Sequence, residues 1–248
     1  MKTQTTPAPR IASPTEWLAA RLELLRAEKE LTRQRESLAA RRRALPWVRV
    51  AKPYVFETTD GPATLADLFD GRSQLIVYHF MFAPGWGEGC KSCSFVSDHF
   101  DGMLPHLAAR DVSLTAVSRA PLSELLPFQR RMGWKFNWVS SHGTDFNYDF
   151  HVSFTPEQLA AGKVPYNFTE LPGFPFEEGP GFSVFVRNAA GEVFHTYSTY
   201  SRGFEHLMNT YNFLDLVPHG RNEAGLEYPM EWVRYHDRYE PAPAVAHA

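Results

Sequence analysis

The chain has 248 residues, of which 44% are hydrophobic and 14% aromatic, so it can bury a sizeable core in one domain with extensions. Its 25 basic and 28 acidic residues leave a formal charge of −3. This composition excludes a disordered or collagen-like chain and gives no reason to expect nucleic-acid binding. Residues 1–10 lack the apolar segment of a signal peptide, and no apolar run reaches the roughly 18 residues of a membrane-spanning helix. We therefore expect a cytoplasmic protein that makes no contact with a membrane.

The first 45 residues predict a long helical arm. Residues 13–16 (Ser-Pro-Thr-Glu) have the pattern of a capping box with proline in the first turn, and neither glycine nor proline follows until Pro46. Large apolar residues recur every seven positions along the arm: Trp17, Leu24, Leu31, Leu38 and Leu45. This stripe predicts either packing on the chain's own domain or a homodimer formed through the helix. We assign residues 1–46 to the arm, 47–240 to a folded domain and 241–248 to a disordered tail.

From residue 48 onward the sequence alternates between strand-like and helix-like patterns. The expected strands cover residues 75–82, 112–117 and 136–139, and the expected helices cover residues 94–109, 122–132 and 204–216. A hairpin is expected at residues 183–187 and 192–197. Residues 145–180 are an aromatic-rich insertion, with one helical turn expected at 156–161. This order predicts one α/β domain with a mixed sheet.

Both cysteines of the chain fall in one tetrapeptide, Cys90-Lys91-Ser92-Cys93, between an expected buried strand and an expected helix. The carboxyl ends of strands in an open α/β sheet border the cleft where ligands bind. A thiol at a helix N-terminus lies near the positive end of the helix dipole, and Lys91 adds a cation, so both favour the thiolate. Two intervening residues place Cys93 one turn away, within reach of a disulfide. The pattern predicts that Cys90 attacks a disulfide and that Cys93 resolves the mixed disulfide.

The order of strand, C-x-x-C, helix, strand, helix, hairpin and helix resembles the thioredoxin-like fold. Residues 60–69 resemble the segment before the first core strand of peroxiredoxin-type proteins. Several strings resemble the domain-of-unknown-function 899 family: residues 70–75, 78–82, 89–94, 131–134, 213–216 and 220–223. The resemblance runs from about residue 45 to residue 239. It implies a thioredoxin-like three-layer fold with a central mixed sheet, extended here by the N-terminal helix and by the insertion before the C-terminal hairpin.

The sequence departs from the related families at three positions. Thioredoxins have tryptophan directly before the first cysteine, where this chain has Gly89, and Trp86 stands four residues upstream of Cys90. Thioredoxins also place a cis-proline before the hairpin, facing the disulfide, and Pro180 is the nearest candidate for that position. Peroxiredoxins carry threonine or serine three residues before their reactive cysteine, where this chain has Gly87. That difference disfavours a peroxidase.

Further side chains are candidates to line the site. Lys91 and Ser92 lie between the cysteines. His79 interrupts the apolar strand upstream, and it is either a core residue hydrogen-bonded to the backbone or a base or ligand near the thiols. Arg119 follows the second expected strand, where it either holds a thiolate or an anionic substrate or is an exposed residue of the loop.

Three functions are open on these observations. The first is a dithiol–disulfide oxidoreductase that acts on a protein disulfide or an oxidised small molecule and is restored by an external thiol reductant. The second is a binding module whose cysteines hold a soft metal or are inert, and the third is a thiol peroxidase that uses Cys90. The sequence contains no nucleotide-binding motif, so we expect no cofactor, and we expect no metal in the oxidoreductase.

Overall fold

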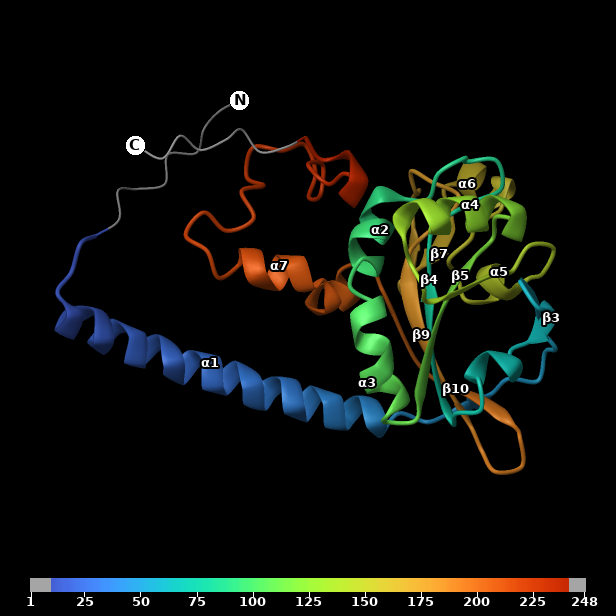
Figure 1. The fold of residues 1–248 in the computed structure, drawn as a ribbon, viewed down its shortest axis with the longest axis horizontal. Helices are drawn as coiled ribbons and strands as arrows, with labels where there is room; N and C mark the ends of the chain where they lie inside the picture. Colours follow the sequence, from blue (N-terminus) through green and yellow to red (C-terminus); the bar gives the residue numbers. More distant parts are fainter. Residues whose placement is uncertain (1–9, 241–248) are drawn as a thin grey trace.

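The computed structural model describes residues 10–240 and contains the expected N-terminal helix as α1 (Pro14–Arg43) (Figure 1). Ser13 caps it: its hydroxyl accepts a hydrogen bond from the Glu16 N–H, and the Glu16 carboxylate accepts one from the Ser13 N–H. None of the residues of α1 is buried, and the helix extends away from the sheet in Figure 1. At its last turn Arg42 lies over the ring of Tyr197, 5.5 Å from the centroid. The apolar stripe is therefore not packed on the chain's own domain.

An eight-stranded mixed sheet forms the centre of the domain, in the order β1-β10-β9-β4-β5-β6-β2-β3. Its strands are β1 (Val48–Arg49), β2 (Val55–Thr58), β3 (Gly61–Thr64), β4 (Gln74–His79), β5 (Val112–Ser118), β6 (Asn137–Ser140), β9 (Gly181–Arg187) and β10 (Val193–Tyr200). Strands β4, β5 and β6 are parallel, whereas β9 runs antiparallel to β4 and forms the expected hairpin with β10. The mixed sheet predicted from the sequence is confirmed.

The two faces of the sheet are packed by different elements, which gives three layers. Successive side chains of a strand point to opposite faces, so Leu75 and Val77 of β4 join one core and Tyr78 joins the other. The Tyr78 face is covered by α2 (Lys91–Ser97) and α4 (Leu122–Met132). The opposite face is covered by the 3₁₀ turn η1 (Asp67–Phe69) and by α5 (Phe146–Asp149). The alternation of side chains along β4 therefore decides which of them can reach α2.

Two expected helices are interrupted in the structure. The helix expected at residues 94–109 is divided into α2, η2 (Asp101–Met103) and α3 (Leu104–Ala108). Gly102 and Pro105 lie at this break, and proline has no N–H with which to continue the helical hydrogen bonds. The expected helix at residues 204–216 is likewise divided into η3 (Ser201–Leu207) and α7 (Asn209–Leu214).

The aromatic insertion is folded. It contains α5, α6 (Pro156–Ala161) and the small antiparallel pair β7 (Val164–Tyr166) and β8 (Thr169–Leu171), and its apolar residues pack around Phe154 and Tyr166. A final 3₁₀ turn, η4 (His236–Arg238), follows the hairpin and α7. The tail expected at residues 241–248 lies outside the described residues. No helix within residues 10–240 is both long and apolar enough to cross a membrane.

Candidate active site

Cys90 and Cys93 lie at the start of α2, close to the carboxyl end of β4. The Cys90 N–H donates a hydrogen bond to the Met81 carbonyl at 3.0 Å, and the Cys90 carbonyl accepts one from the Ser94 N–H at 2.9 Å. These two bonds fix Cys90 as the residue that precedes the helix. Cys90 is partly exposed and Cys93 is buried, and both are free thiols.

The two thiols differ in acidity. The Cys93 thiol, as a hydrogen-bond donor, lowers the pKa of Cys90 to about 7; the backbone N–H groups of Cys93 and Ser92 and the charge of Lys91 act in the same direction, against the effect of burial. Burial and the neighbouring Cys90 sulfur raise the pKa of Cys93 well above its ordinary value. At neutral pH the pair therefore presents a partly ionised, accessible Cys90 and a protonated, buried Cys93.

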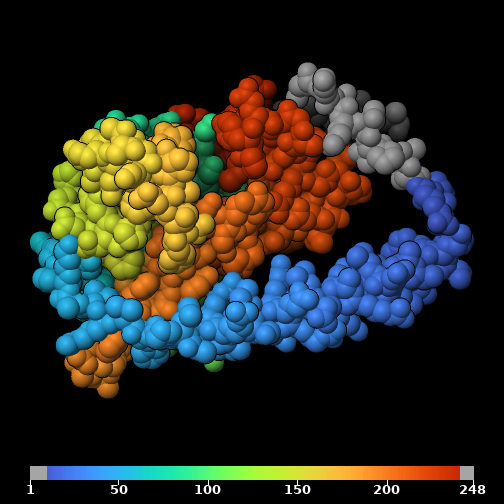
Figure 2. Space-filling view, turned by 180° about the vertical axis from the view of Figure 1, so that it is seen from behind, coloured from blue at the N-terminus to red at the C-terminus, as the bar shows by residue number. Residues whose placement is uncertain are grey.

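Both cysteines open into a cavity of about 420 Å³. Its wall is formed mostly by apolar side chains from within or beside β4, α2, β9, η3 and α7 and from the segment near residue 230; they are Tyr78, Met81, Val96, Pro180, Phe204, Met208, Tyr211, Pro229 and Met230. The C-terminal part of the chain thus builds one side of the cavity. Figure 2 shows the C-terminal segment, in orange and red, on the face seen there.

Three residues predicted for the site lie at it. Lys91 is the exposed first residue of α2, and Ser92 lines the cavity between the cysteines. Pro180 also lines the cavity and directly precedes β9. No peptide bond among residues 10–240 is cis, so Pro180 differs from the cis-proline that thioredoxins carry.

His79 is not brought to the thiols. It follows Tyr78 in β4 and therefore points to the opposite face of the sheet, where its Nε2 lies 2.8 Å from the Ser183 hydroxyl and its ring stacks on Phe150. Burial lowers the pKa of His79 to about 3, so the ring is neutral. His79 is therefore a core residue, as one of the two expectations had it, but its hydrogen bond is to the Ser183 side chain rather than to the backbone.

Arg119 and Trp86 are held by the aromatic insertion, and neither lines the cavity. The Arg119 guanidinium pairs with Glu177 and, at 2.6 Å, with the buried Glu178. The Trp86 indole donates to the same Glu177 carboxylate at 3.3 Å. Because its positive charge is already paired, Arg119 is not free to hold an anionic substrate.

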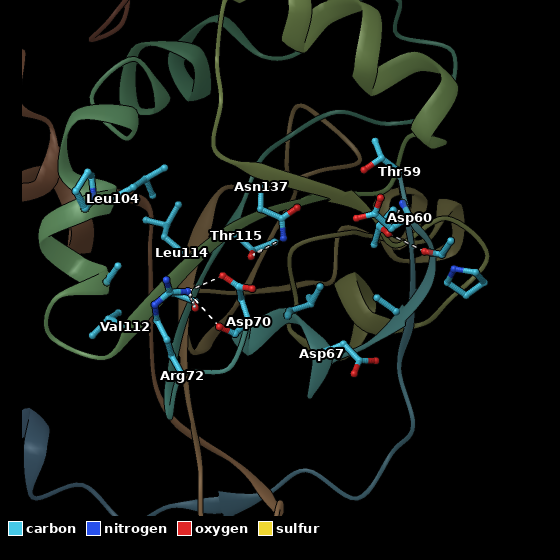
Figure 3. A pocket seen from close by; sticks show the side chains of 18 residues that line it. Thr59, Asp60, Asp67, Asp70, Arg72, Leu104, Val112, Leu114, Thr115 and Asn137 are labelled. Atoms are coloured by element: carbon cyan, nitrogen blue, oxygen red, sulfur yellow. Dashed lines mark hydrogen bonds and ion pairs between the residues drawn. The ribbon is translucent and has the colours of Figure 1, made fainter.

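A second cavity, of about 660 Å³, lies at the other end of the parallel strands (Figure 3). It is bordered by the first residues of β5 and by Asn137 at the start of β6, whereas the cysteines lie at the carboxyl end of β4. Arg72 in this cavity pairs with Asp70 at 2.6 Å, and the Asn137 amide donates to the Thr115 hydroxyl at 3.1 Å. Its lining includes neither cysteine nor histidine, whereas both thiols of the chain line the cavity at the start of α2.

Comparison with known sequences identifies the family. Residues 6–239 match the family of bacterial proteins of unknown function DUF899. The chain belongs to DUF899. No curated protein matches the sequence.

The DUF899 chain has a thioredoxin-like α/β fold, in which the helix that carries the C-x-x-C pair follows a strand paired on one side with a parallel strand and on the other with an antiparallel hairpin. Similar solved structures include the bacterioferritin comigratory protein of Xanthomonas campestris (13% identity, 67% of this chain and 94% of that chain, TM-score 0.43). Peroxidoxin BcpB of Mycobacterium tuberculosis is another (13% identity, 66% of this chain and 96% of that chain, TM-score 0.39). A protein provisionally described as a disulfide isomerase from Bacteroides thetaiotaomicron is a third (18% identity, 68% of this chain and 91% of that chain, TM-score 0.35). Likeness at this level assigns no activity to the DUF899 chain.

Sequence reasoning missed two tyrosines of this DUF899 site. Tyr78 lies beside Cys93, and the period-two alternation of β4 was the signal that could have placed it there. Tyr235 donates a hydrogen bond from its hydroxyl to the Gly89 carbonyl at 2.6 Å, across 146 residues of sequence. No local sequence pattern predicts a contact between residues that are so far apart in the chain.

Proposed function

We propose that this DUF899 protein is a dithiol–disulfide oxidoreductase that uses Cys90 and Cys93. The observation that carries the proposal is the asymmetry of the pair: a partly exposed thiol with a pKa of about 7 stands beside a buried thiol with a raised pKa. An attacking thiol works best when its pKa is near the ambient pH, and a resolving thiol needs only to reach the mixed disulfide. The asymmetry fits these two roles in that order.

The reaction begins when the Cys90 thiolate attacks one sulfur of a disulfide R–S–S–R′. A Cys90–S–R bond forms, the R–S–S–R′ bond breaks, and R′S⁻ leaves and takes a proton from water. Cys93 then loses its proton and attacks the Cys90 sulfur, so that RS⁻ leaves and takes up that proton. The substrate gains two electrons and becomes two thiols, and the protein becomes the Cys90–Cys93 disulfide. An external dithiol reductant restores the reduced pair.

Single substitutions test the two roles. Cys90→Ser is expected to abolish turnover, because no thiolate remains at the exposed position. Cys93→Ser is expected to stop the reaction at a mixed disulfide on Cys90, which mass spectrometry of the intact protein detects as the mass of one R–S group. The double variant Cys90→Ser/Cys93→Ser measures the background. Full turnover by Cys90→Ser would contradict the proposal.

A second candidate function is the binding of a soft metal ion such as Cu(I). The cavity brings together five sulfur-bearing side chains, and thiolate and thioether ligands favour such ions; they are Met81, Cys90, Cys93, Met208 and Met230. Within residues 10–240 no three His, Cys, Asp or Glu side chains form a metal-binding group, so a metal here would depend on the methionines. Anaerobic titration with Cu(I) against a chromogenic chelator tests this function. Binding that Met208→Leu and Met230→Leu do not weaken would exclude the thioether ligands.

A further inference from the structure

The cavity beside Cys90 has the size and the wall of a site for a small apolar molecule. Small-molecule sites occupy about 300–1,000 Å³, and this cavity occupies about 420 Å³. Met81, Val96 and Met230 are among the apolar side chains of its wall. Arg202 and Glu205, the two charged residues of the lining, form an ion pair of 2.8 Å with each other. The wall therefore offers apolar surface and sulfur but no unpaired charge.

An unpaired hydroxyl points to a molecule that accepts a hydrogen bond in this cavity. Tyr78 lines the cavity and is fully buried, and its hydroxyl has no oxygen or nitrogen partner among residues 10–240. The Cys93 sulfur, a weak acceptor, interacts with this hydroxyl. A buried hydroxyl without an oxygen or nitrogen partner is unfavourable, and an acceptor supplied by a ligand removes that cost.

Two residues in the wall have strained backbones. Ser201 and Met230 have φ angles of +49° and +71°, in the left-handed region that residues with side chains rarely adopt. Such strain persists only where the surrounding structure imposes it, and it concentrates at functional sites. At Met230 the strained backbone holds a flexible, apolar side chain against the cavity.

We propose that the cavity binds a small apolar disulfide and that the Tyr78 hydroxyl donates a hydrogen bond to the sulfur that leaves when Cys90 attacks. The proposal rests on the oxidoreductase function above and names its substrate class. The leaving R′S⁻ is the strong acceptor that Tyr78 lacks, and it still takes its proton from water. Burial raises the pKa of Tyr78 well above its ordinary value, so the hydroxyl remains a donor across the physiological range.

Three disulfides distinguish this substrate class from the alternatives. Dipropyl disulfide and bis(2-hydroxyethyl) disulfide have nearly the same shape and differ by a methyl group in place of each hydroxyl, and insulin supplies protein disulfides. The reduced protein is mixed with excess substrate, quenched with acid and alkylated, so that the rate of Cys90–Cys93 oxidation is followed by mass without an external reductant. We expect the second-order rate constant for dipropyl disulfide to exceed that for the hydroxyl compound by about tenfold or more, because most of the wall is apolar and burying two hydroxyls against it costs more than burying two methyl groups.

The outcomes separate this inference from the proposed function. Oxidation by bis(2-hydroxyethyl) disulfide or insulin at a rate equal to or above that of dipropyl disulfide would overturn the apolar substrate and leave the oxidoreductase intact. Failure of all three disulfides to oxidise the pair would overturn the oxidoreductase itself.

A substitution at Met230 tests the cavity wall. Met230→Gln is expected to reduce the preference for dipropyl disulfide severalfold, because an amide replaces apolar surface against the substrate. Met103→Gln is the matched control, since Met103 is also partly buried but lines a different cavity. Equal preference in Met230→Gln and in the wild type would exclude this wall from substrate binding.

Tyr78→Phe tests the hydrogen bond to the leaving sulfur. The loss of rate is expected to depend on the leaving group: about tenfold for dipropyl disulfide, whose alkyl thiolate is basic, and little for 4,4′-dithiodipyridine, whose thiolate is stable without a donor. A purely structural role of Tyr78 predicts the same loss for both substrates. That result would overturn the assignment of Tyr78.

Discussion

At the scale of single residues, the site depends on groups that lower the pKa of one thiol and raise the pKa of the other. The Cys93 thiol and the N–H groups of the first turn of α2 lower the pKa of Cys90. Burial and the Cys90 sulfur raise the pKa of Cys93, against the opposing effect of the Tyr78 hydroxyl. The expected place of Cys90 at a helix N-terminus, beside Lys91, predicted that it would be the more acidic thiol. The contribution of Tyr78 depends on which face of β4 meets α2, and the adjacent His79, the more conspicuous residue in the sequence, lies on the other face.

The acidity of Cys90 makes a prediction about alkylation. The rate of reaction of Cys90 with iodoacetamide is proportional to its thiolate fraction, so it is expected to rise with pH and to reach half its plateau near pH 7. Cys93 is expected to remain unmodified through this range because its pKa is raised and its thiol is buried. Peptide mass spectrometry after timed labelling measures both sites. A half-maximum near 8.5, the ordinary value for a cysteine, would show that the neighbours of Cys90 do not favour its thiolate.

The space around residue 89 explains why this chain has glycine where thioredoxins place tryptophan before the first cysteine. A Cβ at Gly89 would lie 2.5 Å from Cε1 of Phe80 and 3.1 Å from Cε1 of Phe128. Gly89→Ala is therefore expected to lower the free energy of unfolding by about 1–3 kcal/mol, the usual cost of overpacking a core. Gly102→Ala is the control, because a Cβ at Gly102 would meet no atom within 4 Å. Equal denaturant midpoints for the two variants would show that the space at Gly89 is not limiting.

At the scale of elements, the sequence predicted α4, α6 and the β9–β10 hairpin well because each has strong local signals. α6, for example, begins with a capping box at Thr155 and ends at Gly162 in the left-handed region. β2 and β3 were missed because both are only four residues long and their burial is set by distant partners. The expected helix after Cys93 is divided because of Gly102 and Pro105. A prediction made from the periodicity of apolar residues alone does not take these two residues into account.

The helix α1 has charges and apolar residues that suit an antiparallel pair with a second copy. Residues 14–28 carry three acidic and two basic residues, whereas residues 29–43 carry two acidic and six basic ones. In an antiparallel pair the net negative half of one helix therefore lies beside the net positive half of the other. The same arrangement places Leu24 opposite Leu31 and Trp17 opposite Leu38. These four side chains are all exposed in the single chain. We predict that α1 forms a homodimer in this orientation.

Light scattering on a sizing column tests the dimer. The wild type is expected to elute with twice the mass of one chain, and Leu31→Glu is expected to elute as a monomer, because it places a charge in the apolar stripe. Leu22→Glu is a matched control: Leu22 and Leu31 are 48% and 49% exposed, but Leu22 lies on another face of α1. A wild-type monomer at high protein concentration would exclude self-association through this helix.

At the scale of the whole molecule, the C-terminal segment holds the turn that carries Cys90. Tyr235 donates to the Gly89 carbonyl, and Arg131 pairs with both Glu88 and, at 2.8 Å, Asp237. Figure 1 shows this late segment, in red, beside α2. The turn that carries Cys90 is therefore held by residues more than 140 positions after the cysteines, and residues between 201 and 230 line the cavity. Contacts over such separations explain why the cavity could not be foreseen from local patterns.

Removal of the Tyr235 hydroxyl tests this closure. Tyr235→Phe is expected to lower the free energy of unfolding by about 1 kcal/mol, the net value of one hydrogen bond, or somewhat more because the Gly89 carbonyl loses its partner. It is also expected to change the reactivity of Cys90, which the same turn positions. Tyr228→Phe is the control, because Tyr228 is 56% exposed. Identical unfolding curves for the two variants would mean that the C-terminal segment does not stabilise the site.

The most direct test of the account is a redox titration of the Cys90–Cys93 pair. The protein is equilibrated in glutathione or dithiothreitol buffers of defined potential, and the free thiols are alkylated and counted by mass. We expect a reversible two-electron transition with a midpoint between about −270 and −120 mV, the range of working thiol–disulfide oxidoreductases. If the pair forms no disulfide at any potential, the thiols do not act as a redox couple, and the protein is not a dithiol–disulfide oxidoreductase.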